Sequence, residues 1–145
     1  MSLREITLRQ TFVASPERVW SAITDHAGMS KWAGAEVFLV ANGDANGVGA
    51  VRRMKVGGLR IDEEVTYADA PRRLVYKIVR GLPVNFHRGE MILERVHPTS
   101  GGEHTELTWR ILMGSNVPGL VRTSGALLKP ALARGLRELA GLIGA

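Results

Sequence analysis

The hydrophobic pattern is clearest over residues 116–143. On a helical wheel this stretch separates large apolar residues from basic ones, with nearly half of the circumference apolar. The apolar half holds Leu120, Val121, Leu127, Leu128, Ala131, Leu132, Leu136, Leu139 and Ile143, and the other half holds Arg122, Lys129, Arg134 and Arg137. The pattern predicts a long helix whose stripe is wide enough to need a curved sheet as its partner. Pro130 should bend this helix, unless it marks a break between two helices.

The N-terminal pattern predicts a strand followed by two short helices. Residues 3–13 alternate between apolar and polar, as a half-buried strand does. Ser15-Pro16-Glu17 then provides an N-cap serine, a proline at the first helical position and an acid in the first turn. We expect the first helix to run to about residue 24 and the second to occupy residues 25–32.

From residue 35 onward, β-branched and aromatic residues recur between short Gly, Pro and Asn segments. These signals divide the middle of the chain into six strands, over residues 37–41, 50–56, 59–67, 74–80, 84–96 and 105–113. Their links are too short for parallel crossovers, so they should form an antiparallel meander. Gly57-Gly58 suits a two-residue hairpin turn.

The order of these elements predicts an α+β fold in one domain spanning residues 1–145. A seven-stranded, curved antiparallel sheet should enclose the long C-terminal helix on its concave face. The two short helices lie between the first and second strands, and the first strand should close against the seventh.

Composition excludes several classes of function. The chain has no cysteine, so disulfides, thiolate metal sites and thiol nucleophiles are excluded. No apolar run approaches the roughly 20 residues of a membrane span, and the first residues alternate too soon for a signal peptide. We therefore expect a cytoplasmic protein with no transmembrane segment. The net charge of +5 comes from scattered arginines, so we expect no specific nucleic-acid partner.

Several segments, spread over nearly the whole chain, resemble a known superfamily. They are residues 11–20 (TFVASPERVW), 23–25 (ITD), 31–32 (KW), 64–66 (EVT), 70–76 (APRRLVY) and 105–109 (TELTW). In them the chain resembles the helix-grip (SRPBCC) superfamily of START-like and Bet v 1-like proteins, most closely its bacterial polyketide cyclase/dehydrase and lipid-transport branch. The resemblance implies a helix-grip fold with an internal cavity. It does not choose among carriers, receptors, cyclases and dehydratases.

Strand alternation indicates which side chains face the space between sheet and helix. The candidate ligand contacts on those faces and on the helix stripe are Arg52, Met54, Tyr76, Met91, Trp109, Leu128 and Leu132, with Trp32 at the mouth of the site. Most of the apolar residues in this set would also serve as ordinary core.

Four polar residues share the inward faces, so an acid, a guanidinium, an imidazole and a phenol should converge. Glu63 and His87 are the candidate catalytic residues, because either could move a proton while Tyr76 or Arg52 stabilised an enolate oxygen. Two other interpretations remain open. Glu63 and His87 could be ion-paired or merely structural, and a single β-bulge could turn the whole set into water.

Other motifs predict no further chemistry. Gly47-Val48-Gly49 lacks the third glycine and the following helix of a phosphate-binding loop, so we expect a turn there. The histidines, His26, His87, His97 and His104, show no paired metal-ligand spacing. We expect neither a metal nor another cofactor.

The leading hypothesis is that the protein binds a small apolar or amphipathic molecule, such as a lipid, a polyketide or an aromatic metabolite, in its interior. The first alternative is a cofactor-independent polyketide cyclase or dehydratase. The second is an interaction module that uses the basic surface. Either a monomer or a homodimer is compatible with the sequence.

Overall fold

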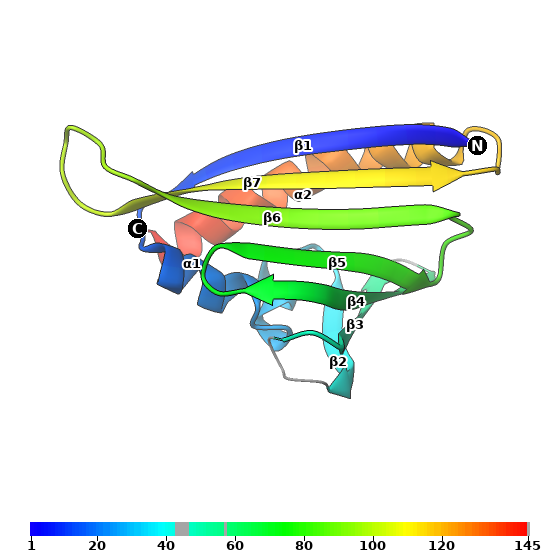
Figure 1. Ribbon diagram of the computed structural model, residues 1–145, viewed down its shortest axis with the longest axis horizontal. Helices are drawn as coiled ribbons and strands as arrows, with labels where there is room; N and C mark the ends of the chain where they lie inside the picture. Colours follow the sequence, from blue (N-terminus) through cyan, green and yellow to red (C-terminus); the bar gives the residue numbers. More distant parts are fainter. Residues whose placement is uncertain (43–46, 57, 145) are drawn as a thin grey trace.

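The computed structural model describes residues 1–42, 47–56 and 58–144, and it shows one curved sheet with helices packed on one of its faces (Figure 1). The strands are β1 (Ser2–Phe12), β2 (Glu36–Asn42), β3 (Ala50–Val56), β4 (Leu59–Asp69), β5 (Arg73–Arg80), β6 (Phe86–Val96) and β7 (His104–Ser115). The helices are α1 (Pro16–Ile23), the 3₁₀ helix η1 (Ala27–Lys31) and α2 (Leu120–Ile143). The predicted helix-grip architecture is confirmed.

The seven strands are antiparallel in the order β1-β7-β6-β5-β4-β3-β2, so the first strand lies beside the seventh, as predicted. β1 and β6 both pair with β7 over long stretches. In contrast, the pairing of β5 with β6 covers only residues 73–76 against 89–92. The sheet is therefore continuous, but it is held together by a short ladder near its middle.

The short helices follow from local sequence signals. The Ser15 side chain accepts a hydrogen bond from the Arg18 N–H at 3.2 Å, which confirms the predicted N-cap of α1. The second short helix is η1, which is a 3₁₀ helix of five residues. Asp25 precedes it and accepts a hydrogen bond from the Gly28 N–H at 3.2 Å.

α2 is continuous through Pro130, so the alternative of two separate helices is wrong. The helix begins at Leu120 rather than at residue 116, after Gly119 adopts a positive φ of 75°. The predicted apolar stripe was too wide, because Leu127 is 70% exposed and Ala131 is exposed as well. In Figure 1, α2 lies behind β1 and β7 at one side of the sheet, so it covers only part of the concave face.

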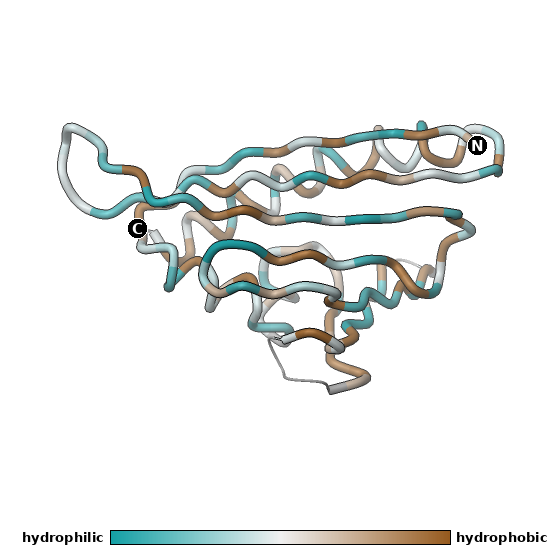
Figure 2. Tube along the Cα trace, in the orientation of Figure 1, coloured by the Kyte–Doolittle hydropathy of each residue, from teal (hydrophilic) through white to brown (hydrophobic). Residues whose placement is uncertain are grey.

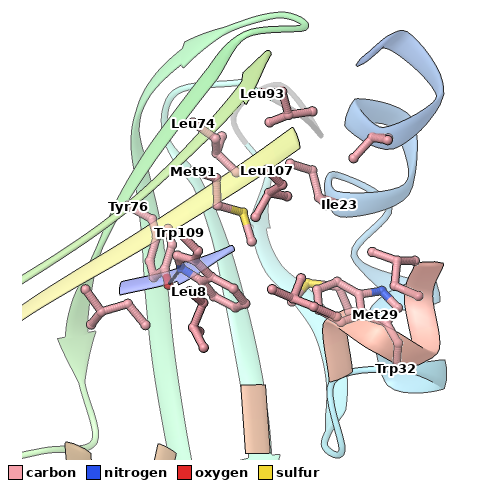
Figure 3. Packing of buried hydrophobic residues seen from close by; sticks show 14 of the residues in the cluster. Leu8, Ile23, Met29, Trp32, Leu74, Tyr76, Met91, Leu93, Leu107 and Trp109 are labelled. Carbon is pink, nitrogen blue, oxygen red and sulfur yellow. Dashed lines mark hydrogen bonds between the residues drawn. The ribbon is translucent and has the colours of Figure 1, made fainter. Parts of the chain in front are cut away.

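The core lies between the concave face and the helices. Figure 2 shows hydrophobic and hydrophilic positions alternating along the strands, as the period-two pattern requires. In Figure 3, Leu74, Met91 and Leu107 of the sheet point toward Ile23 of α1 and toward η1. The core therefore joins the sheet to both short helices as well as to α2.

Two further expectations concern turns and the membrane. Val48 and Gly49 form the expected turn, whereas the predicted Gly57-Gly58 turn includes Gly57, which lies outside the described residues. In the described part of the chain, no helix is both long enough and apolar enough to cross a membrane.

Candidate functional site

Four polar side chains project from the inner face of four adjacent strands. Arg52 lies on β3, Glu63 on β4, Tyr76 on β5 and His87 on β6, and their exposed fractions are 2%, 6%, 2% and 9%. The β3–β4 pairing aligns Arg52 with Glu63. β-bulges flank Glu63 in the β4–β5 pairing, yet Glu63 remains buried. The guanidinium, carboxylate, phenol and imidazole expected from the sequence thus form one buried row across the sheet.

The Arg52 guanidinium has few partners for a buried cation. Its Nη2 lies 3.5 Å from Glu63 Oε1, and its Nη1 donates to Met29 Sδ at 3.2 Å. Its Cζ lies 5.3 Å from the centre of the Tyr76 ring. Among the described residues, the buried Nε has no hydrogen-bond partner. Arg52 therefore retains donor capacity toward the interior.

Arg53 and Asp62, the adjacent pair on the same two strands, are joined by closer hydrogen bonds than Arg52 and Glu63 are. Arg53 follows Arg52 on β3, and Asp62 precedes Glu63 on β4. Both side chains therefore point to the opposite face of the sheet. Arg53 Nε and Nη2 donate to the two carboxylate oxygens of Asp62 at 2.8 and 3.1 Å. These hydrogen bonds hold the pKa of Asp62 below its usual value, although burial opposes the effect. The outer pair has the two-bond geometry that Arg and a carboxylate prefer, and the inner pair does not.

Burial has the opposite consequence for Glu63. Loss of contact with water raises the pKa of its carboxyl, and the charge of Arg52 opposes that rise. Glu63 is therefore a group that can hold or release a proton inside the protein.

Contacts with Trp109 of β7 and Gly89 of β6 hold Tyr76 in place. Its hydroxyl accepts a hydrogen bond from Trp109 Nε1 at 2.9 Å. Its ring covers Gly89, where an added Cβ would collide with the Tyr76 Cζ. Burial raises the pKa of the Tyr76 phenol, so the hydroxyl keeps its proton and can act as a donor.

His87 lies just beyond the end of the β5–β6 ladder. Its Nδ1 accepts a hydrogen bond from the backbone N–H of Ile78 at 3.0 Å, so the neutral ring carries its hydrogen on Nε2. The ring centre is 5.7 Å from that of Tyr76. Burial lowers the pKa of His87 to about 4, so the imidazole is neutral near pH 7.

The apolar candidates surround this row to different depths. Met91 and Trp109 are buried, and Met54, Leu128 and Leu132 are partly buried against the same core. All of these apolar candidates, on the strands and on α2, pack into that one cluster.

Trp32 occupies a different place from the one expected. It is only 3% exposed, so it lies inside the protein rather than at a mouth. An added Cβ at Gly135 of α2 would lie 2.7 Å from the Trp32 carbonyl oxygen, so the 3₁₀ helix end and α2 are in close contact. Trp32 Nε1 is buried without a hydrogen-bond partner among the described residues. Like Arg52 Nε, it is a buried N–H donor for which the described residues supply no acceptor.

Sequence reasoning missed three residues that shape the site. Met29 contacts Arg52, and Gly89 leaves space for the Tyr76 ring. Gly135 allows the backbone of Trp32 to approach α2 closely. The first has no signal in the sequence, because the contact joins η1 to β3. A glycine inside a strand or helix pattern does indicate close approach of another group.

Together, the four side chains of the row supply one carboxyl with a raised pKa (Glu63), one cation (Arg52) and two further donors, the Tyr76 hydroxyl and His87 Nε2–H. Within the described residues, no group of three or more His, Asp or Glu side chains is arranged to hold a metal ion. These side chains can transfer a proton and can form hydrogen bonds to an oxygen-bearing molecule.

Comparison with known proteins gives a family and a fold. A family model described as polyketide cyclase / dehydrase and lipid transport matches residues 4–144. No curated protein matches the sequence significantly.

Solved structures share the fold at low sequence identity. A solution structure from Thermobifida fusca has a TM-score of 0.75 and 21% identity, covering 97% of this chain and 93% of that one. A crystal structure of a Thermus thermophilus protein has a TM-score of 0.73 and 21% identity, covering 97% of each chain. The protein XoxI from Bacillus cereus has a TM-score of 0.71 and 18% identity, covering 96% of this chain and 94% of that one.

Proposed function

Because the chain belongs to the polyketide cyclase/dehydrase and lipid-transport family, we propose that it binds a small apolar or amphipathic molecule between the concave face of the sheet and α2. Lipids, polyketides and aromatic metabolites have the required character. The proposed contacts are Arg52, Met54, Tyr76, Met91 and Trp109 from the sheet, Leu128 and Leu132 from α2, and Trp32.

The observation that carries this proposal is the unused donor capacity of two buried N–H groups, Arg52 Nε and Trp32 Nε1. A buried polar group without a partner costs several kcal/mol in an apolar medium, so such groups normally have partners. Arg52 Nε and Trp32 Nε1 have none among the described residues. A molecule that is apolar over most of its surface could pack against the apolar core residues. If it also carries an acceptor oxygen, that oxygen could accept a hydrogen bond from such a donor.

The test is a thermal-shift screen of fatty acids, sterols, flavonoids and aromatic polyketides, with an apolar fluorescent probe as competitor. A ligand that binds only the folded state should raise the free energy of unfolding by about 2.7 kcal/mol at a hundredfold excess over its Kd.

A matched pair of substitutions locates the binding. Leu132→Trp adds bulk on the partly buried side of α2, and Leu127→Trp adds the same bulk on its exposed side. We expect the first to weaken ligand binding at least tenfold and the second to leave it unchanged, with circular dichroism confirming that both fold. Equal affinity in the two variants, or no shift with any compound, would contradict the proposal.

A second candidate function is cofactor-independent cyclisation or dehydration of a polyketide. It is favoured by the position of Glu63, whose pKa is raised by burial, within the same row as the Tyr76 hydroxyl. In this reaction Glu63 would transfer the proton. The neutral His87, with its hydrogen on Nε2, would donate to an oxygen of the substrate rather than remove a proton. Glu63→Gln should then abolish turnover while ligand binding persists, and turnover that survives in this variant would exclude the role of Glu63.

A further inference from the structure

We propose that the interior site takes the carboxylate of an amphiphilic acid on the Nε and Nη2 edge of Arg52, and that Glu63 takes up one proton as this anion binds. The inference rests on the proposed ligand-binding function and adds the chemical class of the ligand and a coupling to protons.

The first argument is the geometry of Arg52. Its Nε and Nη2 lie on one edge of the planar guanidinium and can donate to both oxygens of a carboxylate. Among the described residues, that edge contacts only Glu63 Oε1, at 3.5 Å from Nη2, and Nε has no hydrogen-bond partner. The edge therefore keeps hydrogen-bonding capacity that a better-placed anion could use.

The second argument is the contrast with the neighbouring pair. Arg53 uses the same edge, Nε and Nη2, to hold both oxygens of Asp62 at 2.8 and 3.1 Å. The two pairs come from consecutive positions of the same two strands. The strands thus allow a two-bond pair, and Arg52 lacks one although it is the more deeply buried arginine.

The third argument is the charge around Glu63. Arg52 of β3 is the one cation paired with it in the described chain, while Tyr76 of β5 and His87 of β6 are both neutral near pH 7. From η1, Met29 contacts Arg52 and is uncharged, and His26 at the N-cap is the further buried titratable side chain on this side of the sheet. The basic residues of α2 are exposed. A bound carboxylate would therefore place two anions beside one buried cation.

Charge balance accounts for the proton. We take the pair to be charged before binding, with Arg52 as the cation and Glu63 as the anion, because Arg52 Nη2 and Glu63 Oε1 lie 3.5 Å apart. The ligand brings one negative charge, and a proton from solvent adds to a Glu63 carboxylate oxygen, so the net charge of the buried site is zero before and after. Burial already favours the protonated form of Glu63, and Arg52, the group that opposes this, becomes engaged by the ligand.

The experiment is titration calorimetry of the full chain with dodecanoate and with 1-dodecanol, in two buffers that differ in ionisation enthalpy. A second pair, 2-naphthoate and 2-naphthol, distinguishes an alkyl acid from an aromatic one. We expect the acid of at least one pair to bind at least tenfold more tightly than its alcohol and to take up about one proton per molecule. Its affinity should fall about tenfold per pH unit above neutrality.

Three variants assign the effect to residues. Glu63→Gln should still bind the acid but take up no proton, and Arg52→Gln should lose the preference for the acid over the alcohol. Asp62→Asn, in the outer pair, should behave like the wild type. Circular dichroism checks that each variant folds. The number of protons taken up is measured on the wild type, so that result does not depend on the folding of any variant.

Equal binding of acid and alcohol, or acid binding without proton uptake, overturns this inference and leaves the proposed function standing. If neither compound of either pair binds and the wider screen also fails, the proposed function is what fails.

Discussion

His87 shows how burial changes the chemistry of a single residue. The imidazole is nearly enclosed, and its Nδ1 is occupied by the Ile78 N–H. Protonation would place a charge in the core and also remove the acceptor of that hydrogen bond. The low pKa, about 4, follows from the desolvation of the ring.

This state of His87 predicts a pH dependence of stability. An unfolded histidine titrates near pH 6.5, so between about pH 6.5 and 4 the unfolded chain binds a proton that the folded protein does not. The free energy of unfolding should therefore fall as the pH is lowered through this range, by up to about 3 kcal/mol from His87 alone. Urea denaturation at a series of pH values measures it.

His87→Asn is the control, because the amide oxygen of asparagine can replace Nδ1 as the acceptor for Ile78 without titrating. Glu63 acts in the opposite direction, since its raised pKa favours the folded state as the pH falls. Only the difference between the wild type and His87→Asn isolates the imidazole. Parallel curves for the two proteins would show that His87 does not cause the effect.

The inward positions of Arg52, Glu63, Tyr76 and His87 could be predicted because a strand places alternate residues on one face. The partners of these residues could not be predicted in the same way. The number of contacts between the Arg52 guanidinium and the Glu63 carboxylate depends on packing between distant segments. The depth at which Trp32 is buried depends on it too.

At the scale of elements, α2 is positioned by close contacts at glycines rather than by its leucines alone. Gly125 and Gly135 are both buried, and each faces a residue from elsewhere in the chain. At Gly135 the neighbour is the backbone of Trp32, which cannot move without moving η1. The sequence pattern emphasised large apolar residues and therefore included Leu127, which is exposed.

Two glycine substitutions in α2 should have opposite effects. Alanine favours a helix over glycine by up to about 1 kcal/mol. At Gly141 nothing lies within 4 Å of the added Cβ, so Gly141→Ala should raise the free energy of unfolding by about that amount. At Gly135 the added Cβ would lie 2.7 Å from the Trp32 carbonyl oxygen, so Gly135→Ala should lower it by about 1–3 kcal/mol. Urea denaturation of both variants decides, and stabilisation by both would mean that η1 and α2 are not held in close contact.

At the scale of the whole molecule, the sequence predicted the fold better than the site. Strand lengths, short links and one amphipathic helix together leave few arrangements, and the observed strand order is the one expected. The coverage of the sheet by α2 was less predictable, because a helical wheel describes an apolar surface without saying what lies against it. The same limit applies to the interior donors, which are recognised only when their neighbours are placed.

The short ladder between β5 and β6 divides the strand pairing of the sheet into two blocks. One block is β1, β7 and β6, and the other is β5, β4, β3 and β2, joined by pairing over residues 73–76 and 89–92. Blocks of this kind can open separately from global unfolding. Tyr76 belongs to one block and His87 to the other, so a ligand seated on this row would act as a cross-link between them. Its binding would slow amide hydrogen exchange most along the boundary between the blocks, over residues 73–76 and 89–92.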